Sequence, residues 1–164
     1  MNKQELQNEI NKTKEHLANM EKMLAECEYE RWKPETDAMY YFIDSDGEIL
    51  HACFDWGLPH CQDRYNIYNC FQTREQAEAE AEKILVRRML EDIAKRLNKG
   101  KEIDWNNGMQ SKYYLYLNND GVIDSEDEFD CKTQGTVYCL DSDFYDVAIQ
   151  EIGEERLKKY LRGE

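Results

Sequence analysis

Two short segments hold the aspartate and asparagine residues that could form a calcium-binding loop. Residues 44–47 read Asp-Ser-Asp-Gly, and residues 118–121 read Asn-Asn-Asp-Gly. In an EF-hand loop the glycine stands at position six, so position one falls on Phe42 or Tyr116, and neither side chain offers a carboxylate. Each segment instead follows an aromatic, β-prone run and precedes an apolar residue, which is a strong hairpin signal. We therefore predict two hairpin turns.

The histidine and cysteine residues of the first half could hold zinc. His51 and Cys53 would share one face of a strand, because strand residues alternate between faces. Structural zinc is typically held by Cys-x-x-Cys-like pairs, since a tight turn aims two ligands at one point, and that spacing does not occur here. We predict strand and loop residues with no metal, and zinc is the alternative. The residues are His51, Cys53, His60, Cys61 and Cys70.

Nucleophilic catalysis could use Cys61 beside His60. Adjacent residues rarely reach the hydrogen-bond geometry that a nucleophile and its base require, and the sequence shows no third residue to orient the base. The motifs GxSxG, GxGxxG and the P-loop do not occur. We predict a non-enzymatic protein without a cofactor.

The charge of the chain indicates which partners it can bind. Its 164 residues include 21 Lys and Arg against 35 Asp and Glu, a net charge of −14, and 41% of them are hydrophobic. This hydrophobic content can form a core, so the chain is not a disordered acidic tail. Affinity for phosphates comes mostly from Lys and Arg, so we exclude nucleic acid and anionic membrane as direct partners.

The acidic residues are concentrated between positions 120 and 146, where only Lys132 opposes them. Such a block repels itself and needs either solvent or a basic partner. We predict a binding surface for a basic protein, with neighbouring aromatic residues as apolar anchors. The alternative is a solvated face that keeps the protein soluble. The predicted partner-binding residues are Asp120, Asp124, Glu126, Asp127, Glu128, Asp130, Asp141, Asp143 and Asp146.

The elements that must position these residues read as two copies of one unit. Residues 40–49 align with residues 114–123, each an aromatic run that closes on Asp-Gly and an apolar residue. In the first copy a β-prone stretch at 65–71 and a helix at about 73–97 follow. In the second copy a β-prone stretch at 136–140 and a final helix follow.

We predict an α+β fold in which an N-terminal coiled-coil helix precedes this duplicated ββα unit. The two hairpins would pair into one antiparallel sheet with both helices on one face. The predicted boundaries are 1–31 for the arm, 32–100 for repeat one and 101–164 for repeat two. Thr73-Arg74-Glu75-Gln76 matches a capping box at the start of the first helix. Gly153 lies inside the last helix and weakens the prediction of an unbroken run.

The N-terminal 31 residues have apolar side chains at alternating steps of four and three, and this heptad spacing predicts a coiled-coil helix. The segment Trp32-Lys33-Pro34 should end this helix. A stripe of this length buries little surface alone, so it needs a partner. We predict homo-oligomerisation, and a helix folded back on its own domain is the alternative. The predicted oligomerisation residues are Leu6, Ile10, Leu17, Met20 and Leu24.

Three segments resemble small uncharacterised proteins of bacterial phages and prophages. They are 31–47, which opens on Arg-Trp-Lys-Pro-Glu, 64–78, which opens on Arg-Tyr-x-Ile, and 148–158, which opens on Ala-Ile-x-Glu-Ile-Gly. The resemblance covers most of the chain except the stretch from Cys53 to Cys61, and its motifs are structural. It implies an accessory phage gene product, a class that includes inhibitors of host defence such as anti-CRISPR proteins.

We expect a phage or prophage accessory protein that binds and inhibits a basic, nucleic-acid-handling host protein, such as a nuclease. The alternative is a structural or assembly protein that oligomerises through its coiled coil. The six cysteines fit a reducing compartment, and the N-terminus shows no apolar signal-peptide region. We therefore expect the protein in the bacterial cytoplasm.

Overall fold

The computed structural model describes residues 9, 11–14, 16–17 and 31–164. The chain divides after Lys33 into an N-terminal segment and a folded unit, Pro34–Glu164. Residues 9, 11–14 and 16–17 are helical, and the side chain of Leu17 is 52% exposed. These residues do not by themselves support a coiled coil, so oligomerisation stays a prediction. The other residues predicted for it lie outside the described residues: Leu6, Ile10, Met20 and Leu24.

The folded unit is α+β, as predicted, and all of its residues are described. Its elements are β1 (Met39–Ile43), β2 (Ile49–Cys53), α2 (Pro59–Asn66), α3 (Arg74–Asn98), β3 (Lys112–Leu117), β4 (Ile123–Glu128), α4 (Phe144–Ile152) and α5 (Glu154–Arg162).

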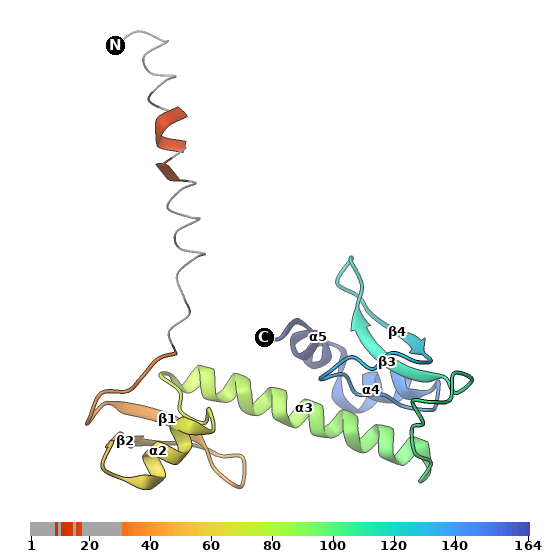
Figure 1. Ribbon diagram of the computed structural model, residues 1–164, viewed down its shortest axis with the longest axis horizontal. Helices are drawn as coiled ribbons and strands as arrows, with labels where there is room; N and C mark the ends of the chain where they lie inside the picture. The colour runs from red at the N-terminus through yellow and green to blue at the C-terminus, as the bar shows by residue number, and fades with distance from the viewer. Residues whose placement is uncertain (1–8, 10, 15, 18–30) are drawn as a thin grey trace. The chain divides into compact units, whose positions relative to one another are not determined.

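The prediction of a single sheet is wrong, because the strands form two separate sheets. β1 pairs with β2 and β3 pairs with β4, each antiparallel, and the two hairpins lie toward opposite ends of α3 (Figure 1). A segment of the same repeat borders each sheet, since Tyr41 forms a bridge with Phe71 and Tyr113 forms one with Cys139. α3 has 25 residues, which corresponds to roughly 37 Å of helix and keeps the hairpins apart.

Both Asp-Gly segments form hairpin turns, as predicted. Gly47 has a φ of 84° and Gly121 has a φ of 73°, a left-handed conformation that glycine adopts without a Cβ penalty. The first side chain of each turn, Asp44 or Asn118, accepts a hydrogen bond from the backbone N–H two residues on, at 3.4 and 3.0 Å. Because the turns are built alike, they align the two hairpins residue by residue.

Each hairpin has two faces, because successive strand residues point to opposite sides. The inner face is the one that holds the bridged tyrosine. With the turns aligned, the inner faces carry Tyr41, Ile43 and Ile49 in repeat one and Leu115, Leu117 and Ile123 in repeat two. The outer faces carry Tyr40, Phe42, Leu50 and Ala52 in repeat one and Tyr114, Tyr116, Asp124 and Glu126 in repeat two.

The two repeats bury opposite faces of their hairpins. In repeat two the inner face is buried, because Leu115 and Ile123 join a core with residues 86–94 of α3 and with α4 and α5. In repeat one the outer face is buried, with Tyr40 fully buried and Phe42 nearly so. The outer face of repeat two and the inner face of repeat one are therefore the less covered ones.

Some local predictions differ from the structure. The stretch 65–71 begins inside α2, which opens with Pro59 in the first turn, and contributes only Phe71 as a bridge. The stretch 136–140 likewise contributes one bridge, because β-propensity decides little without a partner strand. Gly153, with a φ of 94°, separates α4 from α5.

The capping box at Thr73 is confirmed, since its side chain accepts a hydrogen bond from the backbone N–H of Gln76 at 3.3 Å.

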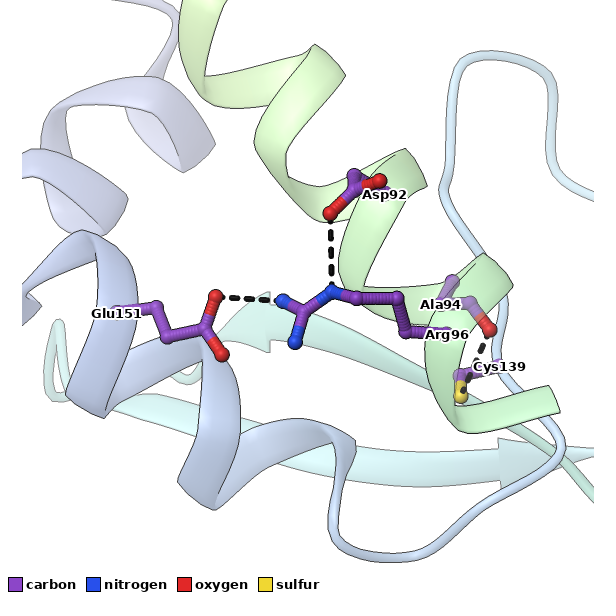
Figure 2. Close-up of polar contacts among 5 residues, drawn as sticks. All are labelled: Asp92, Ala94, Arg96, Cys139 and Glu151. Carbon is purple, nitrogen blue, oxygen red and sulfur yellow. Dashed lines mark hydrogen bonds and ion pairs between the residues drawn. The ribbon is translucent and has the colours of Figure 1, made fainter. Parts of the chain in front are cut away.

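Polar contacts fix repeat two to the C-terminal end of α3 (Figure 2). Arg96 donates to Asp92 of the same helix at 2.9 Å and to Glu151 of α4 at 2.5 Å. The thiol of Cys139 donates to the carbonyl oxygen of Ala94 at 3.9 Å, so the bridge segment lies against the same helix. The Cys139 contact holds the bridge segment that borders β3, and the Arg96–Glu151 pair joins α3 to α4.

Candidate functional site

The predicted partner-binding carboxylates fall into separate places. Asp124, Glu126 and Glu128 alternate along β4 and share its outer row, whereas Asp127 stands on the inner row. The structure thus gathers three of the nine on one face. The others lie in the β3–β4 turn, just after β4, or around the start of α4: Asp120, Asp130, Asp141, Asp143 and Asp146.

Aromatic side chains stand beside these carboxylates on the outer face. Across the two strands Tyr116 faces Asp124, and Tyr114 faces Glu126. The Tyr114 hydroxyl donates to Glu126 Oε2 at 3.2 Å, and the centroids of the two tyrosine rings lie 5.9 Å apart. The ring of Tyr138 extends the row, 5.5 Å from that of Tyr114. We call Tyr114, Tyr116, Asp124 and Glu126 the acidic aromatic face.

Burial and negative charge raise the pKa values of both tyrosines on this face. For Tyr114 partial burial is the first cause and the hydrogen bond to Glu126 is the second; for Tyr116 burial is followed by the charge of Asp124. Both hydroxyls therefore stay neutral at physiological pH. Within the part of the chain that the structure describes, neither Asp124 nor Glu126 forms an ion pair. The face consequently offers carboxylates to a cation from outside.

In repeat one the aromatic pair that corresponds to Tyr114 and Tyr116 is covered by a cationic side chain of the chain itself. The rings of Tyr40 and Phe42 are 5.7 Å apart and inclined at 33°, close to the 5.9 Å and 40° of Tyr114 and Tyr116. Arg64 of α2 lies over the first pair, with its guanidinium carbon 3.5 Å from the centroid of Phe42 and Nη1 donating to the Tyr40 hydroxyl at 2.8 Å. Repeat two has no helix between its hairpin and its bridge segment. Its aromatic pair therefore lacks such a cover.

The acidic aromatic face has groups that suit a cationic side chain. Leu50 and Ala52 flank the aromatic pair in repeat one, and their places are taken by Asp124 and Glu126 in repeat two. A guanidinium over an aromatic ring gains about 0.5–2 kcal/mol, and hydrogen bonds to carboxylates are roughly twice as strong as neutral ones. Aligning the two turns in the sequence already reveals these replacements. The role of Arg64 emerges only once α2 is seen to cover the sheet.

The histidine and cysteine residues considered for zinc do not converge. His51 and Cys53 stand on the inner row of β2, while Cys61 is fully buried and its Sγ accepts a hydrogen bond from Tyr40, on the outer face, at 3.8 Å. The opposite faces of the sheet therefore separate these ligands. Burial also keeps Cys61 from acting as a nucleophile on a dissolved substrate beside the exposed His60.

Among the described residues, one group places three potential metal ligands within 4.8 Å of one another: Glu128, Asp130 and Cys131. Glu128 Oε1 accepts hydrogen bonds from the backbone N–H groups of Phe129, Asp130 and Cys131 at 2.9, 3.4 and 3.5 Å. These bonds, with that of Phe129 first, lower the pKa of Glu128. The carboxylate thus organises the turn after β4.

The cysteines should differ in reactivity toward a thiol-alkylating reagent at pH 8. Cys53 and Cys131 are exposed, but the hydrogen bond and the charge of Asp130 raise the pKa of Cys131, and burial raises that of Cys139. Among the five cysteines that the structure describes, we expect Cys53 to react first and Cys139 to react only after unfolding. Asp130→Asn should accelerate Cys131 by up to about tenfold, the effect of one pKa unit. Mass spectrometry of the cysteine peptides measures this, and an unchanged Cys131 rate in the variant contradicts it.

No family model, curated protein or solved structure matches this chain. In the described part of the chain, no helix has both the length and the apolar character that a membrane crossing requires.

Proposed function

We propose that this chain is a non-enzymatic interaction protein whose acidic aromatic face binds an arginine- or lysine-bearing segment of a basic protein. The contrast between the repeats supports this proposal. In repeat one an arginine of the chain itself, Arg64, covers the aromatic pair of the outer face. In repeat two the matching pair is flanked by Asp124 and Glu126 and has no covering helix.

The partner that we propose is a nucleic-acid-handling protein. The Arg and Lys side chains that bind phosphates also bind carboxylates, often through two parallel hydrogen bonds in the case of Arg. A face of carboxylates and tyrosines can therefore occupy a phosphate-binding groove and exclude nucleic acid from it. Inhibition by such competition, in a phage or prophage accessory protein, is the form of function that we propose.

The binding part of the proposal can be tested with a fluorescein-labelled nona-arginine peptide in low-salt buffer, measured by fluorescence anisotropy. We expect the double variant Asp124→Asn/Glu126→Gln to bind the peptide at least about tenfold more weakly, which corresponds to ~1.4 kcal/mol. Tyr116→Ala should also weaken binding, because it removes an aromatic ring over which a guanidinium could lie. This substitution leaves the net charge unchanged.

The matched control is Asp143→Asn/Asp146→Asn, which removes the same charge from exposed positions near the start of α4. Its affinity for nona-arginine should stay within about twofold of the wild type, since it lies outside the acidic aromatic face. Equal losses in the two double variants would show that the overall charge of −14 attracts the peptide without a defined site.

A further inference from the structure

A groove with a volume of about 720 Å³ opens beside the inner face of repeat one. The end of the β1–β2 hairpin, the segment before α3 and the N-terminal half of α3 line it. Its apolar lining residues include Ile43, Ile49, Ile67, Phe71, Ile84 and Leu85.

Several of these side chains are unusually exposed for their size. Ile67 is 70% exposed, Leu85 48% and Ile84 36%. Next to Ile67, Tyr68 is 72% exposed and holds a φ of 64°, a conformation that costs energy in a bulky residue. Exposed apolar side chains gathered at one groove are typical of a binding site, whereas single ones are ordinary.

Repeat two shows how the same face is covered when it is complete. Leu115 and Ile123 correspond to Tyr41 and Ile49, and they are only 7% and 3% exposed. Two helical layers cover them: the helices of their own repeat, α4 and α5, and the C-terminal half of α3, which comes from repeat one. Among the described helices, α3 is the one with extensive contacts to β1 and β2. The inner face of repeat one therefore lacks the second layer that repeat two has, namely a helix that comes from outside the repeat.

The charges around the groove indicate the chemistry of its occupant. Among the described residues that line it, Arg88 is the one cation. The carboxylates Glu78 and Glu82 are paired with arginines outside the lining, whereas no described residue forms an ion pair with the other three. Hydrogen bonds from the Ser45 hydroxyl and from the Asp46 N–H lower the pKa of Asp44, so it is ionised at neutral pH. The lining carboxylates are Asp44, Asp46, Glu78, Glu80 and Glu82.

We propose that this groove binds an amphipathic helix of a partner protein, with its apolar side chains packed against Ile67 and Leu85 and with Lys or Arg along its flanks. A second copy of this chain fits the groove poorly, because a chain with a net charge of −14 would meet a predominantly acidic lining. The site is separate from the acidic aromatic face and adds a second contact region to the function proposed above.

The probe for this test is a labelled 18-residue peptide with Leu at helical positions i, i+3, i+4 and i+7 and with Lys elsewhere. A peptide of equal composition with its Leu residues spread around the helix is the comparison. We expect the amphipathic peptide to bind more tightly, and Ile67→Asp and Leu85→Asp to weaken its binding at least about tenfold. Both substitutions add negative charge, so a purely electrostatic attraction would instead become stronger.

Met109→Asp is the matched control, because Met109 is 92% exposed and does not line the groove. It should leave the affinity for the amphipathic peptide within about twofold of the wild type. The two proposed sites can fail independently, because nona-arginine tests the acidic aromatic face, whereas the contrast between two peptides of equal charge tests the groove. Circular dichroism establishes that each variant is folded. The proposal is overturned by equal binding of the two peptides, by no binding, by unaltered affinity of the Asp variants, or by a wild-type dimer that Leu85→Asp dissociates.

Discussion

Replacing Lys112 by methionine is expected to destabilise the folded unit by about 3 kcal/mol. The side chain is fully buried, and its ammonium group donates to the carbonyl oxygens of Asn107, Gln110 and Phe129 at 3.2, 2.7 and 2.5 Å. Methionine fills similar space but donates no hydrogen bond, and a hydrogen bond from a charged group contributes roughly 1.5–3 kcal/mol. The lost contacts join the loop before β3 to the end of β4.

Urea unfolding followed by circular dichroism measures this loss. Lys101→Met is the control, because it removes the same charge from an exposed side chain and should change the free energy of unfolding by no more than about 0.5 kcal/mol. A loss in the control as large as in Lys112→Met would assign the effect to net charge.

The elements that the sequence predicts best are those determined by neighbouring residues. The turn that ends in Gly47 and the capping box of Thr73 depend on local backbone chemistry, so their positions follow from the sequence alone. The choice between one sheet and two depends on pairing between distant segments, such as Tyr41 with Phe71. Strand propensity does not determine such pairing. α2 escaped prediction because Pro59–Asn66 lies among the histidine and cysteine residues that suggested strands and loops.

The negative charge of the candidate site was predictable from the sequence, but the residues that form it were only partly predictable. Acidic residues between 120 and 146 pointed to β4, and strand alternation then selects Asp124 and Glu126 from that block. The groove of repeat one was not predictable, because Leu85 has the spacing of an ordinary core position on a helix. Its 48% exposure shows that the layer expected to cover it does not come from its own repeat.

The asymmetry between the repeats has a physical origin in α3. This helix follows the first hairpin, as α4 follows the second, but its 25 residues carry it beyond its own repeat and into the core of the other. Repeat two therefore gains a cover for its inner face, and repeat one receives none in return. α2 covers the outer face of repeat one only. Two hairpins of nearly the same build thus leave opposite faces less covered.

Leu157→Ala is expected to lower the free energy of unfolding by about 3 kcal/mol and to release α5 from repeat two. Leu157 is fully buried in the core with Leu115 and Ile123, and it is the only buried residue of α5. The helix has nine residues and begins after the break at Gly153, so it is too short to be stable without packing. Urea unfolding and amide hydrogen exchange at residues 154–162 measure both effects.

The control for this prediction is Leu161→Ala, which truncates the same side chain at the half-buried edge of α5 and should cost about 1 kcal/mol. Exchange in the β1–β2 hairpin should change little in either variant, because its buried residues Tyr40 and Phe42 contact α2 rather than α5. If Leu157→Ala and Leu161→Ala lose equal stability, the half-buried contacts at the edge of α5 stabilise it as much as its buried contact does. If exchange accelerates equally in both hairpins, the folded unit unfolds as one cooperative body, and the inner face of repeat two cannot be uncovered separately.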